Sequence, residues 1–179
     1  LKTNNDNLIT CDLFGLIKLN LKTKKISKIS SNNVKDLFII GHNKYLVASS
    51  SSTNLISENG SQLIFNGRSK CAFYDSLNQF YWIGTSQGLY GGKQGHLKEY
   101  KLKDQRISAN NIIKHENQLL LSTSNNGIIS IKNNILSKYT NSNNGLLSDR
   151  IMKITKKDNQ LFIGHNNGIQ IYNFSTKRY

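Results

Sequence analysis

A short sequence pattern recurs along the chain at a nearly constant interval. Its clearest copies are DNQLFIGHNNGIQIY (residues 158–172), NQFYWIGTSQGLY (78–90) and ENQLLLSTSNNGIISI (116–131). Two fainter copies are NDNLITCDLFGLIKL (5–19) and HNKYLVASSSSTNLI (42–56). The glycines at 15, 88, 127 and 168 lie 73, 39 and 41 residues apart, and the first interval holds two repeats. A period of about 40 residues is typical of solenoids and propellers, where each four-stranded blade takes about 40–45 residues.

Each period contains only β-strand signals. A short apolar segment, such as RIMKI from Arg150, precedes a polar turn and then the apolar core of the pattern. A second polar turn, a strand such as GIQIY, and a weaker fourth segment follow. Segments of four to six residues bounded by Asn, Gly, Ser or Asp are typical of an antiparallel meander. The absence of proline from the whole chain agrees with strands that keep every backbone donor.

The sequence therefore predicts an all-β fold, a β-propeller built of four-stranded antiparallel blades with about five repeats. A single meander cannot bury both of its faces, so neighbouring blades must cover them. The whole chain, 1–179, is expected to form one propeller domain or segment, either a small closed ring or an arc of a larger one. The expected repeats span approximately 1–30, 31–66, 67–105, 106–144 and 145–179.

The pattern also assigns structural positions. Trp82, the only tryptophan, lies in the continuous apolar run YWIG and is expected in the core, as is its counterpart Phe162. A close backbone approach or a bulge is expected at Gly84 and Gly164. Positive-φ turn conformations, which glycine adopts without a steric penalty, are expected at three further positions: Gly88, Gly127 and Gly168.

The signature resembles the two-component regulator propeller repeat, whose pattern is approximately N-L-W-I-G-T-x-x-G-G-L. The segment GLLSDRIMKITKKDNQLFIGHNNGIQIY from Gly145 is similar to the whole pattern, and WIGTSQGLY from Trp82 to its core. The second and fourth repeats depart from it, with VASS at Val47 and LST at Leu121 in place of I-G-T.

The resemblance implies a periplasmic sensor domain of hybrid two-component systems of the Bacteroidetes type. It further implies a larger parent protein with more propeller blades, a β-sandwich domain, a transmembrane helix and a histidine kinase. The partners expected from it are the neighbouring blades or the sandwich domain of that parent, with a homodimer as a further option. LKTNNDNL at the start contains no apolar segment, so no signal peptide is expected in this chain, and membrane contact is expected only through segments that it lacks.

Composition restricts the other classes of protein. The chain has 24 basic and 10 acidic residues, a net charge of +14. A nucleic-acid-binding protein would use such charge on one face with interleaved aromatic residues. Here the basic residues are spread over every repeat, so nucleic acid is not the expected partner. The 25 asparagines fall largely in the turns that the repeat requires.

Signs of catalysis are absent from the sequence. The four histidines occupy non-equivalent places, the acidic residues are scattered, and neither GxSxG nor a Walker motif occurs. Cys11 and Cys71 lack the CxxC spacing of a zinc site. We therefore expect no enzyme activity, no cofactor and no metal.

The polar loops on one face are the expected binding region, because propeller loops between blades and turns between second and third strands share a face. Arginine binds carboxylate or sulfate through two parallel hydrogen bonds, and amide side chains suit sugar hydroxyls. The predicted ligand-binding residues are Arg68, Arg106, Asn110, Arg150, His165 and Asn166. The alternative for the same residues is that the Asn side chains are simple turn formers and the arginines are solvated.

Two functions follow from these observations. The first is a non-catalytic sensory propeller that recognises an oligosaccharide or another periplasmic ligand for a signal-transduction regulator. The alternative is a structural propeller that binds other proteins and no small molecule.

Overall fold

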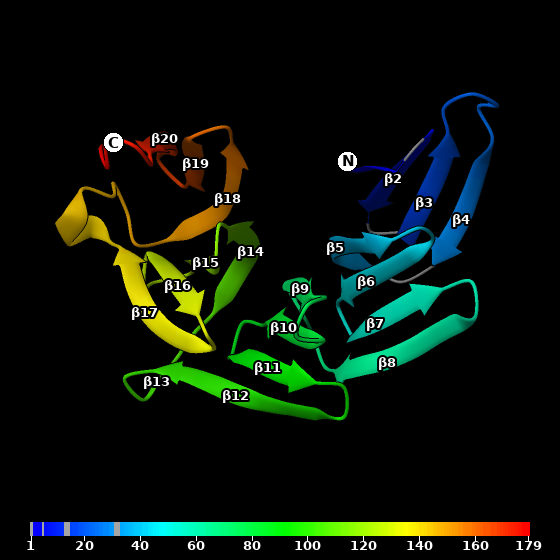
Figure 1. Cartoon of the computed structure of the whole chain (residues 1–179), viewed down its shortest axis with the longest axis horizontal. Coiled ribbons are helices and arrows are strands. Elements are labelled where there is room, and N and C mark those ends of the chain that lie inside the picture. The colour runs from blue at the N-terminus through cyan, green and yellow to red at the C-terminus, as the bar shows by residue number, and fades with distance from the viewer. Residues whose placement is uncertain (1, 5, 13–14, 31–32) are drawn as a thin grey trace. The chain divides into compact units, whose positions relative to one another are not determined.

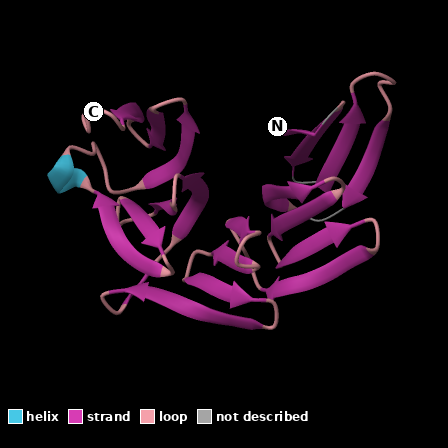
Figure 2. Cartoon of the chain, in the orientation of Figure 1, coloured by secondary structure: helices cyan, strands magenta, loops and turns pink. Residues whose placement is uncertain are grey.

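The computed structural model describes residues 2–4, 6–12, 15–30 and 33–179, and β-strands dominate it (Figures 1 and 2). The strands form five small antiparallel sheets, in each of which strands consecutive in sequence are neighbours. We call these sheets blades 1 to 5. Their strands are β1 (Lys2–Asn4), β2 (Asn7–Asp12), β3 (Gly15–Asn20) and β4 (Ile26–Ser30) in blade 1; β5 (Val34–Gly41), β6 (Lys44–Ser49), β7 (Ser52–Ser57) and β8 (Gly60–Asn66) in blade 2; β9 (Cys71–Asp75), β10 (Phe80–Gly84), β11 (Leu89–Lys93), β12 (His96–Leu102) and β13 (Gln105–Arg106) in blade 3; β14 (Ala109–His115), β15 (Gln118–Thr123), β16 (Ile128–Lys132) and β17 (Ile135–Thr140) in blade 4; and β18 (Ile151–Lys157), β19 (Gln160–His165) and β20 (Gly168–Asn173) in blade 5.

The predicted all-β propeller fold with five repeated blades is confirmed, with two departures from four strands per blade. Blade 3 gains a fifth strand, because β13 folds back on β12 with Lys101 opposite Arg106. Blade 5 has three strands in the described residues, and its C-terminal end adds one bridge between Asn173 and Arg178. A 3-10 turn, Ser142–Asn144, precedes blade 5.

By its internal contacts the chain divides into two compact units. Unit 1 comprises Leu1–Ile83 and Gly92–Leu97, and unit 2 comprises Gly84–Gly91 and Lys98–Tyr179. The boundary passes through blade 3, so blades 1 and 2 belong to unit 1 and blades 4 and 5 to unit 2. The single domain expected for residues 1–179 stays a prediction.

Each unit has an apolar core between two adjacent blades. In unit 1, Ile9 and Leu16 of blade 1 pack against a set from blade 2: Val34, Leu37, Tyr45 and Val47. In unit 2, Leu120 and Ile128 of blade 4 pack against residues around and within blade 5: Leu146, Ile151, Ile154, Leu161 and Ile163. The core residues of the two units occupy the same places in the repeat, so the periodicity of the sequence is also a periodicity of packing.

One position of the repeat is buried in every blade except the last. It lies near the middle of the second strand, and its exposure is between 0 and 2% at Ile9, Leu46, Trp82 and Leu120. In blade 5 the same place holds Phe162, which is half-buried. The neighbouring position on the third strand behaves alike: Leu16, Thr53, Leu89 and Ile128 are each 0% exposed, whereas Ile169 is 74% exposed. This face of blade 5 is therefore apolar and open among the described residues.

Side-chain oxygens on the first strands join one blade to the next. The Asp36 carboxylate of β5 accepts a hydrogen bond from the Ala72 amide of β9 at 3.1 Å. In unit 2, the Asn111 side chain of β14 accepts one from the Ile154 amide of β18, also at 3.1 Å. Both acceptors follow an irregularity in the strand register, which turns an extra side chain toward the neighbouring blade.

A hydroxyl group closes the turn between the second and third strands in three blades. Thr85 accepts hydrogen bonds from the amides of Gln87 (3.1 Å) and Gly88 (2.9 Å) and donates one to the Gly88 carbonyl. Thr123 makes the corresponding bonds in blade 4, and Ser49 does so in blade 2. Such local bonds favour turns over continued strand. This explains the Thr or Ser that follows the apolar run of the pattern.

The predicted positive φ is present at Gly127 (67°) and Gly168 (126°) and is wrong at Gly88, which does not appear among the positive-φ residues. Gly88 is instead restricted by space, since a Cβ there would lie 3.0 Å from Glu99 Oε1 and 3.3 Å from the Tyr90 ring. Gly127 is restricted twice, because its Cβ would also lie 2.4 Å from the Thr140 carbonyl oxygen. At Gly164 a Cβ would make only an ordinary contact of 3.6 Å, so no close approach requires this glycine. The alternative expectation, a bulge, is met on the facing strand, where the register shifts between Ile151 and Lys153.

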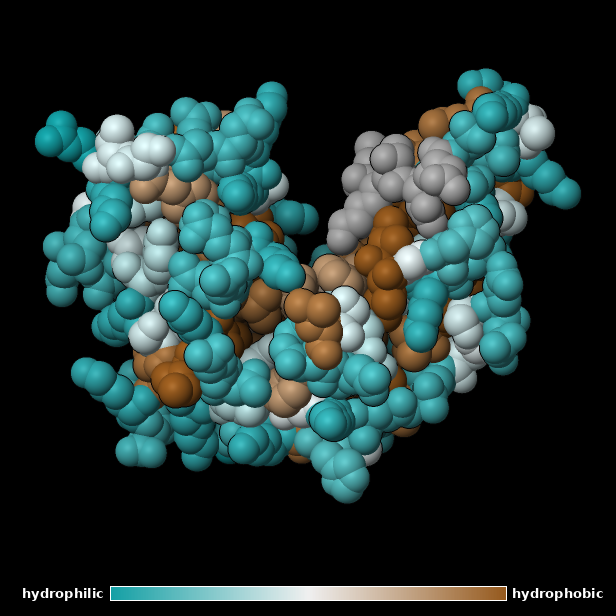
Figure 3. All heavy atoms as spheres, viewed as in Figure 1, coloured by the Kyte–Doolittle hydropathy of each residue, from teal (hydrophilic) through white to brown (hydrophobic). Residues whose placement is uncertain are grey.

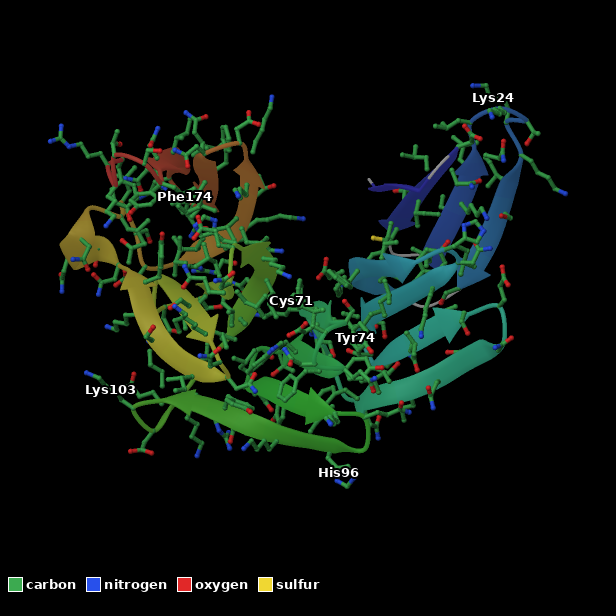
Figure 4. All side chains as sticks on the ribbon, viewed as in Figure 1. Lys24, Cys71, Tyr74, His96, Lys103 and Phe174 are labelled. Carbon is green, nitrogen blue, oxygen red and sulfur yellow. The ribbon has the colours of Figure 1, made fainter. Side chains whose placement is uncertain are left out.

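The charged residues lie mostly on outer strands and turns. Lys24 and Lys103 are exposed in the turns before β4 and β13, and His96 is exposed at the start of β12. Their side chains project away from the strands (Figure 4). The surface over β12 is largely hydrophilic (Figure 3). Most of the net positive charge is thus carried by solvated side chains.

Candidate ligand-binding surfaces

The predicted ligand-binding residues belong to two different units of the chain. Arg68 belongs to unit 1, where it is exposed in the loop between β8 and β9. The other five, Arg106, Asn110, Arg150, His165 and Asn166, belong to unit 2. Within unit 2, Asn110 and His165 both lie at Ile151 of blade 5, and Arg150 precedes it in the sequence.

Arg106 does not lie in a loop between blades, as the sequence predicted, but in the edge strand β13. Its Nε atom lies 3.0 Å from Glu99 Oε1, an ion pair across the hairpin of β12 and β13. Lys101 Nζ lies 3.8 Å from the other oxygen of the same carboxylate. The guanidinium group therefore already has an acidic partner on the outer edge of blade 3.

Asn110 lies at the start of β14 and is half-buried in a polar network. Its amide group donates to the Ile151 carbonyl oxygen of blade 5 at 2.8 Å, and its oxygen accepts from the Ser124 hydroxyl at 3.2 Å. The Ser124 and Ser108 hydroxyls lie 3.0 Å apart. Sequence reasoning identified the asparagine but missed both serines, because nothing in the repeat pattern links a loop residue with the turn after β15.

His165 ends β19 opposite Ile151, the residue whose carbonyl Asn110 binds. It is 7% exposed, and its Nδ1 atom accepts the Asn167 amide at 3.3 Å, replacing the turn hydroxyl of blades 2, 3 and 4. Its buried Nε2 atom has no hydrogen-bond partner among the described residues. Because Nδ1 acts as an acceptor, a ring proton lies on Nε2, and this atom is a donor.

We call Ser108, Asn110, Ser124 and His165 the turn-side cluster. Arg150 is exposed just before β18, with its amide bonded to the Ser148 hydroxyl at 3.1 Å, and Asn166 is exposed in the turn after His165. Hydroxyl, amide and imidazole groups offer paired donors and acceptors of the kind that a sugar requires. The group as a whole contains one formal charge, on Arg150.

A second surface, in unit 1, was missed by sequence reasoning. A cavity of about 450 Å³ opens where blade 1 meets the turn between β5 and β6. Its volume is in the range of small-molecule sites. Its lining residues are Asn7, Lys18, Asn20, Thr23, Lys25, Ser27 and His42.

The sequence carries a signal for this cavity that the repeat pattern obscured. Lys18 follows Leu16 by two residues on β3, and it is the register partner of Ile9 on β2. Side chains two apart on a strand share a face, so this lysine lies on the same face as the core residues Ile9 and Leu16. A lysine on the inward face of a strand is an anomaly that points to a polar site at the end of the core.

Other kinds of site find little support in the part of the chain that the structure describes. No three His, Cys, Asp or Glu side chains there come close enough to hold a metal ion. Nor does that part contain a helix with the length and hydrophobicity needed to cross a membrane.

The chain was also compared with known proteins. No protein-family model matches it, and no curated protein matches it. Solved structures do match. The extracellular domain of a protein assigned as the hybrid two-component system BT4673 from B. thetaiotaomicron is similar over 99% of this chain, with a TM-score of 0.76 and 21% identity. The corresponding domain of BT3049 from the same organism is similar over 93%, with a TM-score of 0.71 and 18% identity.

A third similar structure comes from a different system. PorZ, a surface component of the type-IX secretion system of Porphyromonas gingivalis, matches 96% of this chain with a TM-score of 0.70 and 13% identity. The chain spans 26%, 25% and 31% of the lengths of these three structures. At such identities the likeness establishes the propeller fold, in agreement with the resemblance seen in the sequence.

Proposed function

We propose that the chain is a ligand-binding segment of an extracellular or periplasmic sensor propeller, non-catalytic in itself, within a two-component type of regulator. The observation that carries the proposal is the structural likeness to extracellular domains of two such systems, which extends over nearly the whole chain. The expected ligand is an oligosaccharide. Its support is the turn-side cluster, where hydroxyl and amide groups from blade 4 lie beside a buried histidine of blade 5 with an unused donor.

A thermal-shift screen of the full chain with neutral and acidic oligosaccharides tests this proposal. A ligand at 100 times its Kd stabilises the folded state by about 2.7 kcal/mol. For a chain of this size, that corresponds to a rise in Tm of about 5–10 °C. A panel in which no oligosaccharide changes the Tm would contradict the proposal.

Arginine variants then locate the site. Arg150→Gln removes an exposed charge next to the turn-side cluster, whereas Arg106→Gln removes one that is paired with Glu99 at an outer edge. We expect an acidic oligosaccharide to lose affinity with Arg150→Gln and to keep it with Arg106→Gln. Equal affinities in the parent and the Arg150→Gln variant would place the site elsewhere.

The likeness to PorZ favours a second function, a structural propeller that binds other proteins. Phe162 and Ile169 give blade 5 an open apolar face that such a partner could cover. A propeller of this kind would show no Tm change with any glycan. It would bind instead to a protein partner in a manner that Ile169→Glu abolishes.

A further inference from the structure

The cavity of unit 1 lies at the polar end of the core between blades 1 and 2. Lys18 is half-buried, and its Nζ atom donates to Asn43 Oδ1 at 3.2 Å. The Tyr45 hydroxyl, from the core of blade 2, donates to the same oxygen at 3.4 Å. The lysine is therefore held in place at the mouth of the cavity by a neutral acceptor.

The positive charge in the cavity is not balanced by a carboxylate in its lining. The charged side chains of the lining are Lys18 and Lys25, and the lining contains no acidic residue. In blade 1 as described, the acidic side chain that forms an ion pair is Asp6, which lies 2.8 Å from Lys22 on the exposed surface. Glu58 approaches from blade 2 but accepts from the Asn43 amide group at 2.6 Å. A half-buried ammonium without a counter-charge gains free energy when an anion supplies one.

The propeller fold does not require this arrangement. In blade 4 the places of Lys18 and Ser27 are taken by Ser130 and Ser137, which are register partners in the same way. Their hydroxyls lie 2.7 Å apart and satisfy each other. Blade 1 thus has the cationic Lys18 in the cavity lining, where blade 4 has two serines that hydrogen-bond to each other.

We propose that this cavity binds the carboxylate or sulfate group of an anionic ligand, with Lys18 and Lys25 as its cationic contacts. The Asn7 amide group and the hydroxyls of Thr23 and Ser27 supply hydrogen bonds to the rest of a sugar-sized molecule. Asn20 shapes the lining, because its Oδ1 atom accepts the amides of Lys22 and Thr23 and its Nδ2 atom donates to Asn7 Oδ1 at 3.4 Å. The sugar part of the ligand rests on the proposed function. The anion site rests on the cavity alone.

The test is a titration of the full chain followed by NMR of the backbone amides. The four probes are glucuronate, glucose 6-sulfate, inorganic sulfate and glucose. Variants Lys18→Gln and Lys25→Gln each remove one charge from the cavity. The matched control is Lys28→Gln, which removes an exposed charge from the same strand as Ser27 outside the cavity lining. Thermal melting of each variant verifies folding, and Lys25 is exposed enough for its replacement to leave the core intact.

We expect the anionic probes, and not glucose, to shift the amides of residues 18–25 and 42. Affinity should fall at least about tenfold in the two cavity variants, the loss of one charged hydrogen bond, and stay unchanged in Lys28→Gln. A larger effect with glucuronate or glucose 6-sulfate than with inorganic sulfate assigns the sugar as well as the anion. No response to any anion, or an equal loss in Lys28→Gln, overturns the inference.

These outcomes are separate from those of the proposed function. Anion binding in the cavity together with a negative oligosaccharide screen would support the anion site and contradict the sensor proposal. The opposite result is an oligosaccharide that binds the Lys18→Gln variant as well as the parent, while the anionic probes shift no amides. It would support the sensor proposal and contradict the anion site.

Discussion

Trp82 is the largest of the fully buried side chains, with 2% of its surface exposed. Its ring lies 5.1 Å from that of Phe80, two residues earlier on the same face of β10. In blade 5 the equivalent place holds Phe162, which is half-buried. The two aromatic residues therefore allow the effect of burial to be measured at one position of the repeat.

We expect Trp82→Ala to lower the free energy of unfolding by about 3–5 kcal/mol, the usual cost of truncating a buried aromatic side chain. Phe162→Ala should cost clearly less, because part of that ring already contacts water. Urea denaturation monitored by circular dichroism measures both. Equal losses in the two variants would show that their burial in solution is alike.

His115, at the end of β14, is a second residue whose burial has a measurable effect, here on the pH dependence of stability. It is 6% exposed and stacks on Phe174 with ring centroids 3.8 Å apart. Burial lowers the pKa of the imidazole below its usual value, Lys156 lowers it further, and Glu116, 4.0 Å away, partly opposes the shift. The folded state therefore binds a proton less readily than the unfolded state.

The sign of the pH dependence follows from that difference. The contribution of His115 to stability is complete above its unfolded pKa of about 6.5 and is lost as the pH falls below it, where only the unfolded chain gains the proton. The free energy of unfolding should fall between pH 7.5 and 5.5, and it should fall less in His115→Gln. His96→Gln, which changes an exposed histidine, is the control and should follow the parent. A fall of the same size in all three proteins would exclude His115 as its source.

At the scale of the element, the first apolar residue of the third strand packs against the next blade in the cores between blades 1 and 2 and between blades 4 and 5. Leu16 and Ile128 fill that place in the two described cores, both with 0% exposure. Ile169 fills it in blade 5 and is 74% exposed. Blades 4 and 5 both have isoleucine at this place. Ile128 is covered by blade 5, whereas Ile169 is exposed in the described structure.

A pair of identical substitutions tests this difference. Ile128→Ala should destabilise the protein by about 2–5 kcal/mol, because it leaves a cavity in the core of unit 2. Ile169→Ala should change stability by no more than about 0.5 kcal/mol, as is usual for exposed positions. The shift of the denaturant midpoint measures both values, provided that the variants and the parent have the same m value. A large loss at Ile169 would show that a second molecule or another part of the chain covers it in solution.

At the scale of the whole molecule, the net charge of +14 has two parts. Most of it lies on exposed turns and outer strands, where lysines are solvated and bring little energy. A small remainder, at Lys18 and its neighbours, is placed in a cavity without acidic partners in its lining. The overall charge is therefore a poor guide to ligands, whereas the place of a single lysine on an inward face is a good one.

The sequence by itself determined the repeat, and through it the blades. Alternating apolar residues decide which strand faces are buried, and turn residues such as Thr85 and Thr123 close their loops with their own hydroxyls. These are local interactions, encoded within a few residues. For the same reason the sequence predicted the positive φ of Gly127 correctly but misassigned Gly88, whose constraint comes from Glu99 eleven residues away.

Only the tertiary structure decided what the candidate site residues contact. Arg106 was expected in a loop and lies instead in a hairpin against Glu99, because β13 extends blade 3 beyond its predicted fourth strand. The turn-side cluster unites residues from the connection before β14, from β14, from the turn after β15 and from β19. The anion cavity unites blade 1 with a turn of blade 2. Periodicity defines how each blade folds, but a binding surface forms where non-equivalent residues of adjacent blades meet, and that depends on packing between them.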